Sequence, residues 1–122
     1  MRSLTIPIQA GRLTMAIRRE ELPLEFCLTY ATRQNPKRLY LLVSKLLGKH
    51  WPVRPRVMRD IHIRLAAKVM DVPGPVLVIG MAETATALGR GVAEEIALHT
   101  QRDDILYLQT TRCRLARPLA FG

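Results

Sequence analysis

The chain has 122 residues, of which 48% are hydrophobic and 24% charged, a composition that is typical of one globular domain and excludes a disordered or fibrous chain. No apolar run approaches the roughly 20 residues that a membrane helix needs. The N-terminal segment lacks the apolar centre of a signal peptide, so we expect a cytoplasmic protein with no membrane partner. Cys27 and Cys113 form no Cys-x-x-Cys motif, which excludes a zinc framework and does not favour a disulfide scaffold.

Positive charge is concentrated in the middle of the chain. The 19 Lys and Arg residues against 10 Asp and Glu residues give a net charge of +9, and residues 33–64 hold nine basic residues against Asp60 alone. Such a field favours an anionic partner, either nucleic acid or a phosphorylated small molecule, unless it is only a solvated face. The few aromatic residues do not alternate with basic ones as a base-stacking surface requires, so nucleic acid is the less favoured partner.

The N-terminal half combines a ribbon, a helix and a strand. Apolar residues alternate over 4–9 and again over 13–17, on either side of Ala10-Gly11, which predicts a β-ribbon with Pro7 on an edge. The pattern then turns helical over 22–30, and Asn35-Pro36 ends that helix. The apolar run over 39–43 predicts a strand that is buried on both faces.

The C-terminal half alternates between helix and strand. We expect helices near 55–70 and 84–98 and strands near 76–79 and 105–109. Residues 57, 61, 65 and 69 form the apolar stripe of the first helix, and His62 and His99 are expected on helix surfaces. The fold class is therefore α/β, a parallel β-α-β-α-β sheet with an N-terminal β-ribbon, in a single domain over 1–122.

Three polar loops leave the carboxyl ends of these strands, where open α/β sheets bind ligands. They are residues 44–50, 80–84 and 110–114. Gly80 allows a tight turn and close backbone approach, and the helix that follows offers unpaired N–H groups to an anion. The spacing fits neither a Walker A loop nor GxGxxG, and Gly89 and Gly91 are expected to allow close packing of the helix on the sheet.

Two of these loops carry charged residues with more than one interpretation. Glu83 is either a helix N-terminal charge that the macrodipole stabilises or a partner of a Mg²⁺-bridged pyrophosphate. Lys45 and Lys49 either bind phosphate, with Gly48 supplying the turn between them, or are simply solvated. His50 is more typical of a structural histidine than of a general base.

Three segments resemble one protein family. They are NPKR and VSKLLGKH within residues 33–53, IGMAETA within 74–92, and TTR within 103–121. In this order they resemble the phosphoribosyltransferase-like family of bacterial stress and tellurium-resistance type operons, which belongs to the type I phosphoribosyltransferase superfamily. The resemblance covers about residues 22–121.

The resemblance implies a partial type I phosphoribosyltransferase fold. It implies that 5-phosphoribosyl 1-diphosphate and Mg²⁺ bind over the sheet edge and that a nitrogen acceptor displaces pyrophosphate. The pyrophosphate loop would be Gly80, Met81, Ala82, Glu83, Thr84 and Ala85. Thr110–Arg112 resembles the start of the mobile loop over the reacting centre, which gives Thr111 and Arg112 as binding residues. The basic set of Lys45, Gly48, Lys49 and His50 would help to form the hood over the acceptor.

One departure from the family pattern limits these expectations. Members carry a VDDxxxTG segment that holds the ribose and its 5-phosphate, and this sequence has none, since Asp103-Asp104 precedes a strand and lacks a following TG. We therefore expect the N-terminal part of a longer enzyme, inactive or incomplete alone, with a possible second copy or missing C-terminal part over its open sheet. The alternatives are a non-catalytic phosphate- or nucleotide-binding module and, less favoured, a basic nucleic-acid-associated protein.

Overall fold

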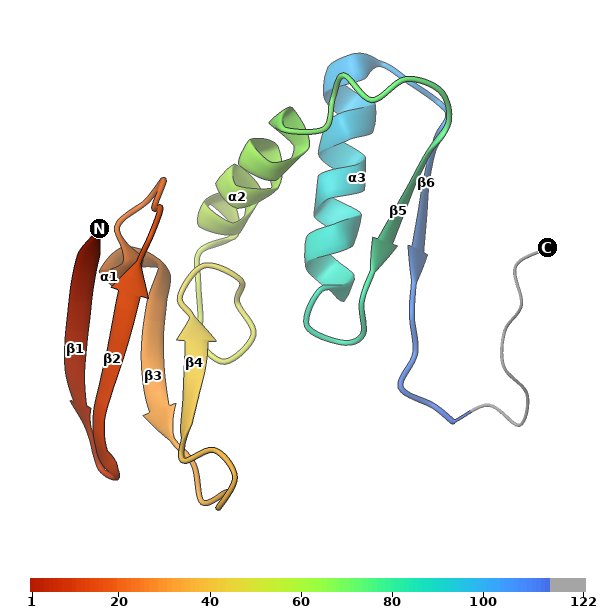
Figure 1. Cartoon of the computed structure of the whole chain (residues 1–122). Coiled ribbons are helices and arrows are strands. Elements are labelled where there is room, and N and C mark those ends of the chain that lie inside the picture. Colours follow the sequence, from red (N-terminus) through yellow and green to blue (C-terminus); the bar gives the residue numbers. More distant parts are fainter. Residues whose placement is uncertain (115–122) are drawn as a thin grey trace. The chain divides into compact units, whose positions relative to one another are not determined.

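The computed structural model describes residues 1–114 and divides the chain into two compact units, Met1–Met58 and Arg59–Gly122. Each unit combines strands with helical segments (Figure 1). In chain order the elements are β1 (Arg2–Ile8), β2 (Gly11–Ile17), α1 (Leu24–Cys27), β3 (Leu28–Thr32), β4 (Tyr40–Ser44), α2 (Pro55–Ala67), β5 (Val76–Gly80), α3 (Thr86–Thr100) and β6 (Ile105–Gln109). No described helix is long and apolar enough to cross a membrane.

The predicted N-terminal ribbon is confirmed. β1 and β2 pair antiparallel from Arg2 opposite Ile17 to Ile8 opposite Gly11, so that a two-residue turn joins them. Gly11 has φ +136°, a conformation that side chains rarely adopt. Alternate residues point to the same face, and this face is apolar in both strands and half-buried. The ribbon is attached to the next segment by Arg2, whose guanidinium contacts both Glu20 and Glu25.

The predicted helix over 22–30 is wrong from Leu28 onward. Only α1 is helical there, and β3 follows it directly and pairs antiparallel with β4, from Leu28 opposite Ser44 to Thr32 opposite Tyr40. Thr and Tyr favour strands, and the antiparallel partner supplies hydrogen bonds that a single helical turn does not. Asn35 shapes the connecting turn, because its side-chain oxygen accepts from the Lys37 N–H at 2.9 Å.

The strand predicted over 39–43 is therefore present as β4, with β3 as its partner, but it is not buried on both faces, since Leu42 is 43% exposed. The three-stranded parallel β-α-β-α-β sheet is not confirmed: residues 1–114 are mixed α and β with small sheets, of which one is parallel. That parallel pair is β5 and β6, with Val76 opposite Ile105 and Gly80 opposite Gln109. Both strands lie where they were predicted, and α3 is the crossover between them (Figure 1).

The second unit has its core between α3 and one face of the parallel pair. α3 contacts both β5 and β6, and its Ile96 is only 1% exposed, with Ala93 also buried. Residues of the opposite strand face remain about half exposed; they are Leu77, Ile79, Leu106 and Leu108. The alternation of the strand thus separates a covered face from an open apolar one.

The buried stripe of α2 differs from the predicted one. Leu65 and Val69 are 38% and 39% exposed, whereas His62 and Ala66 are buried. The prediction that His62 lies on the helix surface is therefore wrong. The physical reason is Gly91 of α3, where a Cβ would overlap the imidazole ring. A glycine at that position leaves room for the His62 ring, which the apolar stripe of the helix alone would place on the surface.

Candidate functional site

Two of the predicted loops leave the same edge of the parallel pair. β5 ends at Gly80 opposite Gln109, the last residue of β6, so both loops begin side by side. The Thr110 N–H donates to the Gly80 carbonyl oxygen at 3.0 Å and extends the ladder by one bond. This edge is the carboxyl end of both strands, the position at which α/β sheets bind ligands.

Hydrogen bonds within the loop over 81–85, and one to Thr110 in the loop after β6, hold this loop in place. The Ala82 N–H donates to Thr110 Oγ1 at 2.7 Å, and the Ala85 N–H donates to the Met81 carbonyl at 3.0 Å. The Thr86 N–H donates to the Glu83 carbonyl at 3.3 Å, and α3 begins there. The Ala82–Glu83 peptide bond is cis. Several backbone donors of the loop are thus already bonded within the protein.

Arg112 brings a cation to this loop. Its Nε donates to the Ala82 carbonyl oxygen at 3.3 Å, and its Nη1 lies 3.8 Å from Glu83 Oε1. Both side chains are well exposed, at 70% for Arg112 and 68% for Glu83. The backbone turns around Arg112, where the hydroxyl of Thr111 accepts from the Cys113 N–H at 3.1 Å. An anion at this edge would therefore meet a guanidinium that the loop holds in place.

Gly80 and Gly89 let α3 cross the end of β5 at close range. A Cβ at Gly89 would lie 2.9 Å from the Gly80 Cα, and one at Gly80 would lie 2.6 Å from the Tyr107 hydroxyl and 2.8 Å from the Ala85 carbonyl. The predicted packing role of Gly89 is thus confirmed, whereas Gly91 packs against α2. Gly80 is constrained by the protein's own atoms, independently of any ligand.

Tyr107 is a site-supporting residue that sequence reasoning missed. Its hydroxyl donates to the Thr86 carbonyl at 2.6 Å and so fastens the start of α3 to β6. The one available signal was an aromatic residue with a polar tip inside an apolar strand, since a buried Tyr hydroxyl usually finds a partner. Because the two bonded residues are 21 positions apart in the sequence, no local pattern predicts this hydrogen bond.

The other predicted site residues lie in the first unit, and their part in the site stays a prediction. Lys45 Nζ donates to the Glu25 carbonyl at 3.0 Å and lies 5.9 Å from the centre of the Trp51 ring. Gly48 has φ +68°, as the predicted turn between Lys45 and Lys49 requires. The exposed His50 lines a hollow on β3 and β4 beside Trp51.

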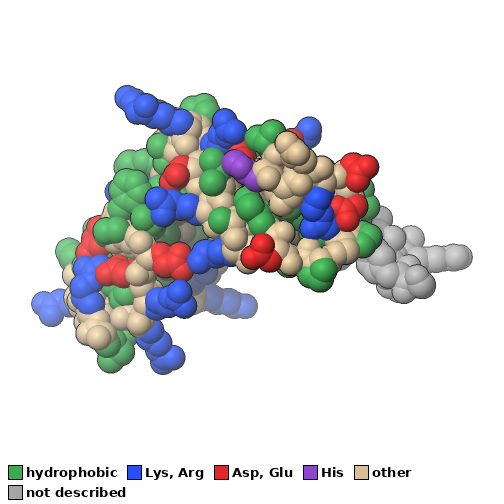
Figure 2. Space-filling model, turned by 90° about the horizontal axis from the view of Figure 1, so that it is seen from above, with side chains coloured by type: hydrophobic (Ala, Val, Ile, Leu, Met, Phe, Trp, Pro, Cys, Tyr) green, Lys and Arg blue, Asp and Glu red, His purple; other side chains and the backbone are tan. Residues whose placement is uncertain are grey.

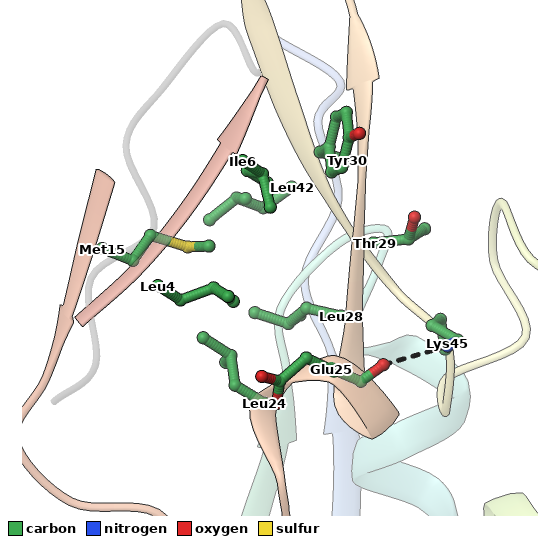
Figure 3. Close-up of a pocket in the computed structure, with 10 residues that line it drawn as sticks. All are labelled: Leu4, Ile6, Met15, Leu24, Glu25, Leu28, Thr29, Tyr30, Leu42 and Lys45. Carbon is green, nitrogen blue, oxygen red and sulfur yellow. Dashed lines mark hydrogen bonds between the residues drawn. The ribbon is translucent and has the colours of Figure 1, made fainter. Parts of the chain in front are cut away.

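The first unit also holds an apolar pocket of about 230 Å³ between the ribbon and the β3–β4 hairpin. Leu4, Ile6 and Met15 reach into it from the ribbon, opposite Leu28 and Leu42 (Figure 3). Lys45 and Glu25 also line the pocket and are joined by the hydrogen bond from Lys45 to the Glu25 backbone (Figure 3). Arg2 holds the pKa of Glu25 down at about 2, so this carboxylate is charged at neutral pH.

The carboxylate on these loops suits a metal ion that binds together with a phosphate ligand. Mg²⁺ is usually held by one or two carboxylates together with substrate phosphates, and Glu83 is a carboxylate on the loop itself. Among residues 1–114 no group of three His, Cys, Asp or Glu could form a metal cage. Asp104 lies at the other end of β6, where Arg102 lowers its pKa by hydrogen bonding at 2.7 Å. Glu83 is thus the carboxylate at this edge that could hold Mg²⁺ together with the oxygens of a bound diphosphate.

Comparison with known proteins identifies the family. Residues 27–121 match the family described as phosphoribosyl transferase. No curated protein and no solved structure matches the chain significantly. The matched region runs from the end of α1 beyond β6 and contains both loops of the candidate site. Since it covers well over half of the sequence, the chain belongs to the phosphoribosyl transferase family.

Proposed function

We propose that this protein acts in phosphoribosyl transfer, with 5-phosphoribosyl 1-diphosphate as donor and a nitrogen compound as acceptor. The observation that carries the proposal is the meeting of loops 80–85 and 110–112 at one strand edge, inside the region that matches the family. The diphosphate of the donor would occupy this edge.

Arg112 is the main anion contact in this arrangement. A guanidinium forms strong, directional hydrogen bonds with phosphate oxygens, and the bond from Nε to the Ala82 carbonyl keeps it over the loop. The backbone donors of Ala82 and Ala85 are already used, which leaves more of the binding to side chains. The N-terminal end of the 15-residue α3 adds a favourable dipole.

Mg²⁺ completes the proposed site as a cofactor that enters with the donor. Glu83 would hold it, together with phosphate oxygens. When bound, the ion would neutralise the charge of the departing diphosphate. The chain's own contribution is to orient the diphosphate between Arg112 and the loop, because orientation is a large part of the rate gain in such reactions.

The first unit supplies the remaining parts of the proposal. Lys45, Gly48, Lys49 and His50 form a basic segment after β4, and the segment would contribute to the hood over the acceptor. Within this segment Lys45 is held by the Glu25 carbonyl and the Trp51 ring.

Calorimetry with pyrophosphate and with 5-phosphoribosyl 1-diphosphate, with and without Mg²⁺, tests the proposal. We expect binding by the full chain and a loss of about tenfold or more in Arg112→Gln, because a hydrogen bond to a charged group contributes about 1.5–3 kcal/mol. Arg90→Gln is the matched control, since Arg90 is equally exposed at 71% but pairs with Glu94 on α3. Equal affinities in the wild type and Arg112→Gln would contradict the proposal.

Pyrophosphate release in the presence of a panel of nitrogen bases separates the enzyme from a binding module. Mg²⁺-dependent release that needs both the base and Arg112 supports transfer. Binding of both ligands without release fits either the incomplete enzyme expected from the sequence or the non-catalytic phosphate-binding class.

A further inference from the structure

The contact between Glu83 and Arg112 places a carboxylate beside the cation that the proposed function assigns to the diphosphate. We propose that Glu83 is an internal competitor: without ligand it pairs with Arg112, and a diphosphate binds by taking its place on the guanidinium. This inference rests on the proposed function and adds to it the residue that limits the affinity of the loop for a diphosphate.

The anchoring of Arg112 makes such an exchange possible. Its Nε donates to the Ala82 carbonyl, which fixes the guanidinium at the loop, while Nη1 points toward Glu83. The guanidinium has five N–H donors, so it keeps this backbone bond while its outer donors change partner. A diphosphate would thus exchange with a side chain rather than move the arginine.

The pair itself is weak enough to be displaced. Its oxygen and nitrogen lie 3.8 Å apart, at the outer limit of an ion pair, and both side chains are about two-thirds exposed. Arg90 and Glu94 form an ion pair on α3 with nearly the same exposure, yet the Arg90 Nε lies only 2.9 Å from Glu94 Oε1. Exposed pairs contribute about 0–1 kcal/mol, whereas a phosphate oxygen can form a shorter, charge-assisted bond.

A double-mutant cycle in metal-free buffer with a chelator tests the inference, with inorganic pyrophosphate as the probe. Removing the competitor in Glu83→Gln should raise affinity about two- to fivefold, because an exposed pair worth up to about 1 kcal/mol no longer opposes binding. Glu94→Gln removes the same charge from the neighbouring helix and should change affinity less than twofold. Circular dichroism of each variant verifies that the fold is retained.

The decisive measurement is the effect of Glu83→Gln in the Arg112→Gln background. Competition predicts that most of the gain disappears there, because no guanidinium remains to be released. A gain of the same size in both backgrounds would mean simple charge repulsion and would overturn the inference. A wild type that binds pyrophosphate as tightly as Glu83→Gln would also overturn it and leave the proposed function intact.

Failure of the proposed function gives a different result. In that case neither the wild type nor Glu83→Gln binds pyrophosphate, with or without Mg²⁺. The Mg²⁺-free condition is essential, because a carboxylate that holds the metal would change affinity in the opposite direction once Mg²⁺ is present.

Discussion

Single residues decide how α2 packs on α3. His62 is buried and its Nε2 has no hydrogen-bond partner among the described residues, while Gly91 leaves the space that the ring occupies. Beside them Glu95, only 8% exposed in its side chain, pairs with Arg59 at 2.8 Å and with His99 at 3.1 Å. A neutral ring and a satisfied carboxylate thus share one small interface.

Gly91→Ala should lower the stability of the second unit. The added methyl overlaps the His62 ring, and overpacking costs about 1–3 kcal/mol, against a gain of about 1 kcal/mol in helix propensity. In the His62→Ala background the ring is absent, so Gly91→Ala should instead stabilise by about 1 kcal/mol. Urea unfolding followed by far-ultraviolet circular dichroism measures both values, and a stabilising effect in both backgrounds would refute the packing argument.

Acidification should weaken the same interface through His62. Burial lowers the pKa of His62, although Glu95 and Glu94 act in the opposite direction. The stability that the neutral ring contributes is complete above the unfolded pKa of about 6.5 and is lost as the pH falls from there through the lowered folded pKa. Urea midpoints between pH 8 and pH 5 should fall more steeply for the wild type than for His62→Gln.

Circular dichroism is the appropriate signal for this experiment, because the single tryptophan, Trp51, lies in the first unit. Glu95 titrates in a separate window, since Arg59 lowers its pKa from an already acidic value. Parallel pH profiles for the wild type and His62→Gln would show that the buried ring does not control the transition.

At the scale of elements, the crossing of α3 over the end of β5 shapes the candidate site. Gly80, Gly89 and Tyr107 meet there, and the Tyr107 hydroxyl holds the Thr86 carbonyl at the start of the helix. The same crossing sets where the loop over 81–85 leaves the sheet. Substitutions at Gly80 therefore test packing before they test ligand approach, because a side chain there would contact protein atoms first.

Tyr107→Phe should leave the fold intact and loosen the start of α3. Loss of the hydrogen bond to Thr86 costs about 0.5–1.5 kcal/mol, and Gly80→Ala should cost about 1–3 kcal/mol through overpacking. Because the Tyr107 hydroxyl is one of the atoms that the new methyl meets, the double variant should be more stable than the sum of the single effects predicts. Strict additivity in urea unfolding would argue against the close crossing.

At the scale of the whole molecule, charge is distributed unevenly along the chain. Residues 33–64 carry nine basic residues and one acid, and Lys and Arg side chains project from the surface among fewer Asp and Glu (Figure 2). Several of these cations have partners within the protein: Lys45 at a carbonyl, Arg59 at Glu95 and Arg64 at Asp60. The positive field attracts anions in general, but these cations are not all available to one polyanion.

Binding to a generic DNA duplex should accordingly be weak and only modestly salt-dependent. Each neutralised phosphate contributes about −0.9 to the slope of log K against log salt, and we expect a slope of magnitude below about 3. Fluorescence anisotropy with a labelled duplex at several salt concentrations measures it. A steep slope would restore the nucleic-acid interpretation, and Lys37→Glu/Arg38→Glu in the β3–β4 turn would then locate the contact.

The sequence by itself determined the ribbon, the positions of β4, β5 and β6, the helices α2 and α3, and the family, because alternation, helical periodicity and segments such as IGMAETA and TTR are local patterns. Tertiary structure alone decided the rest. β3 is a strand because β4 pairs with it, and His62 is buried because Gly91, distant in sequence, leaves a gap for it. Arg112 meets Glu83 only because β5 and β6 end side by side. Each of these features depends on contacts between segments far apart in the chain. Local propensity and periodicity do not include the energy of such contacts and therefore cannot predict them.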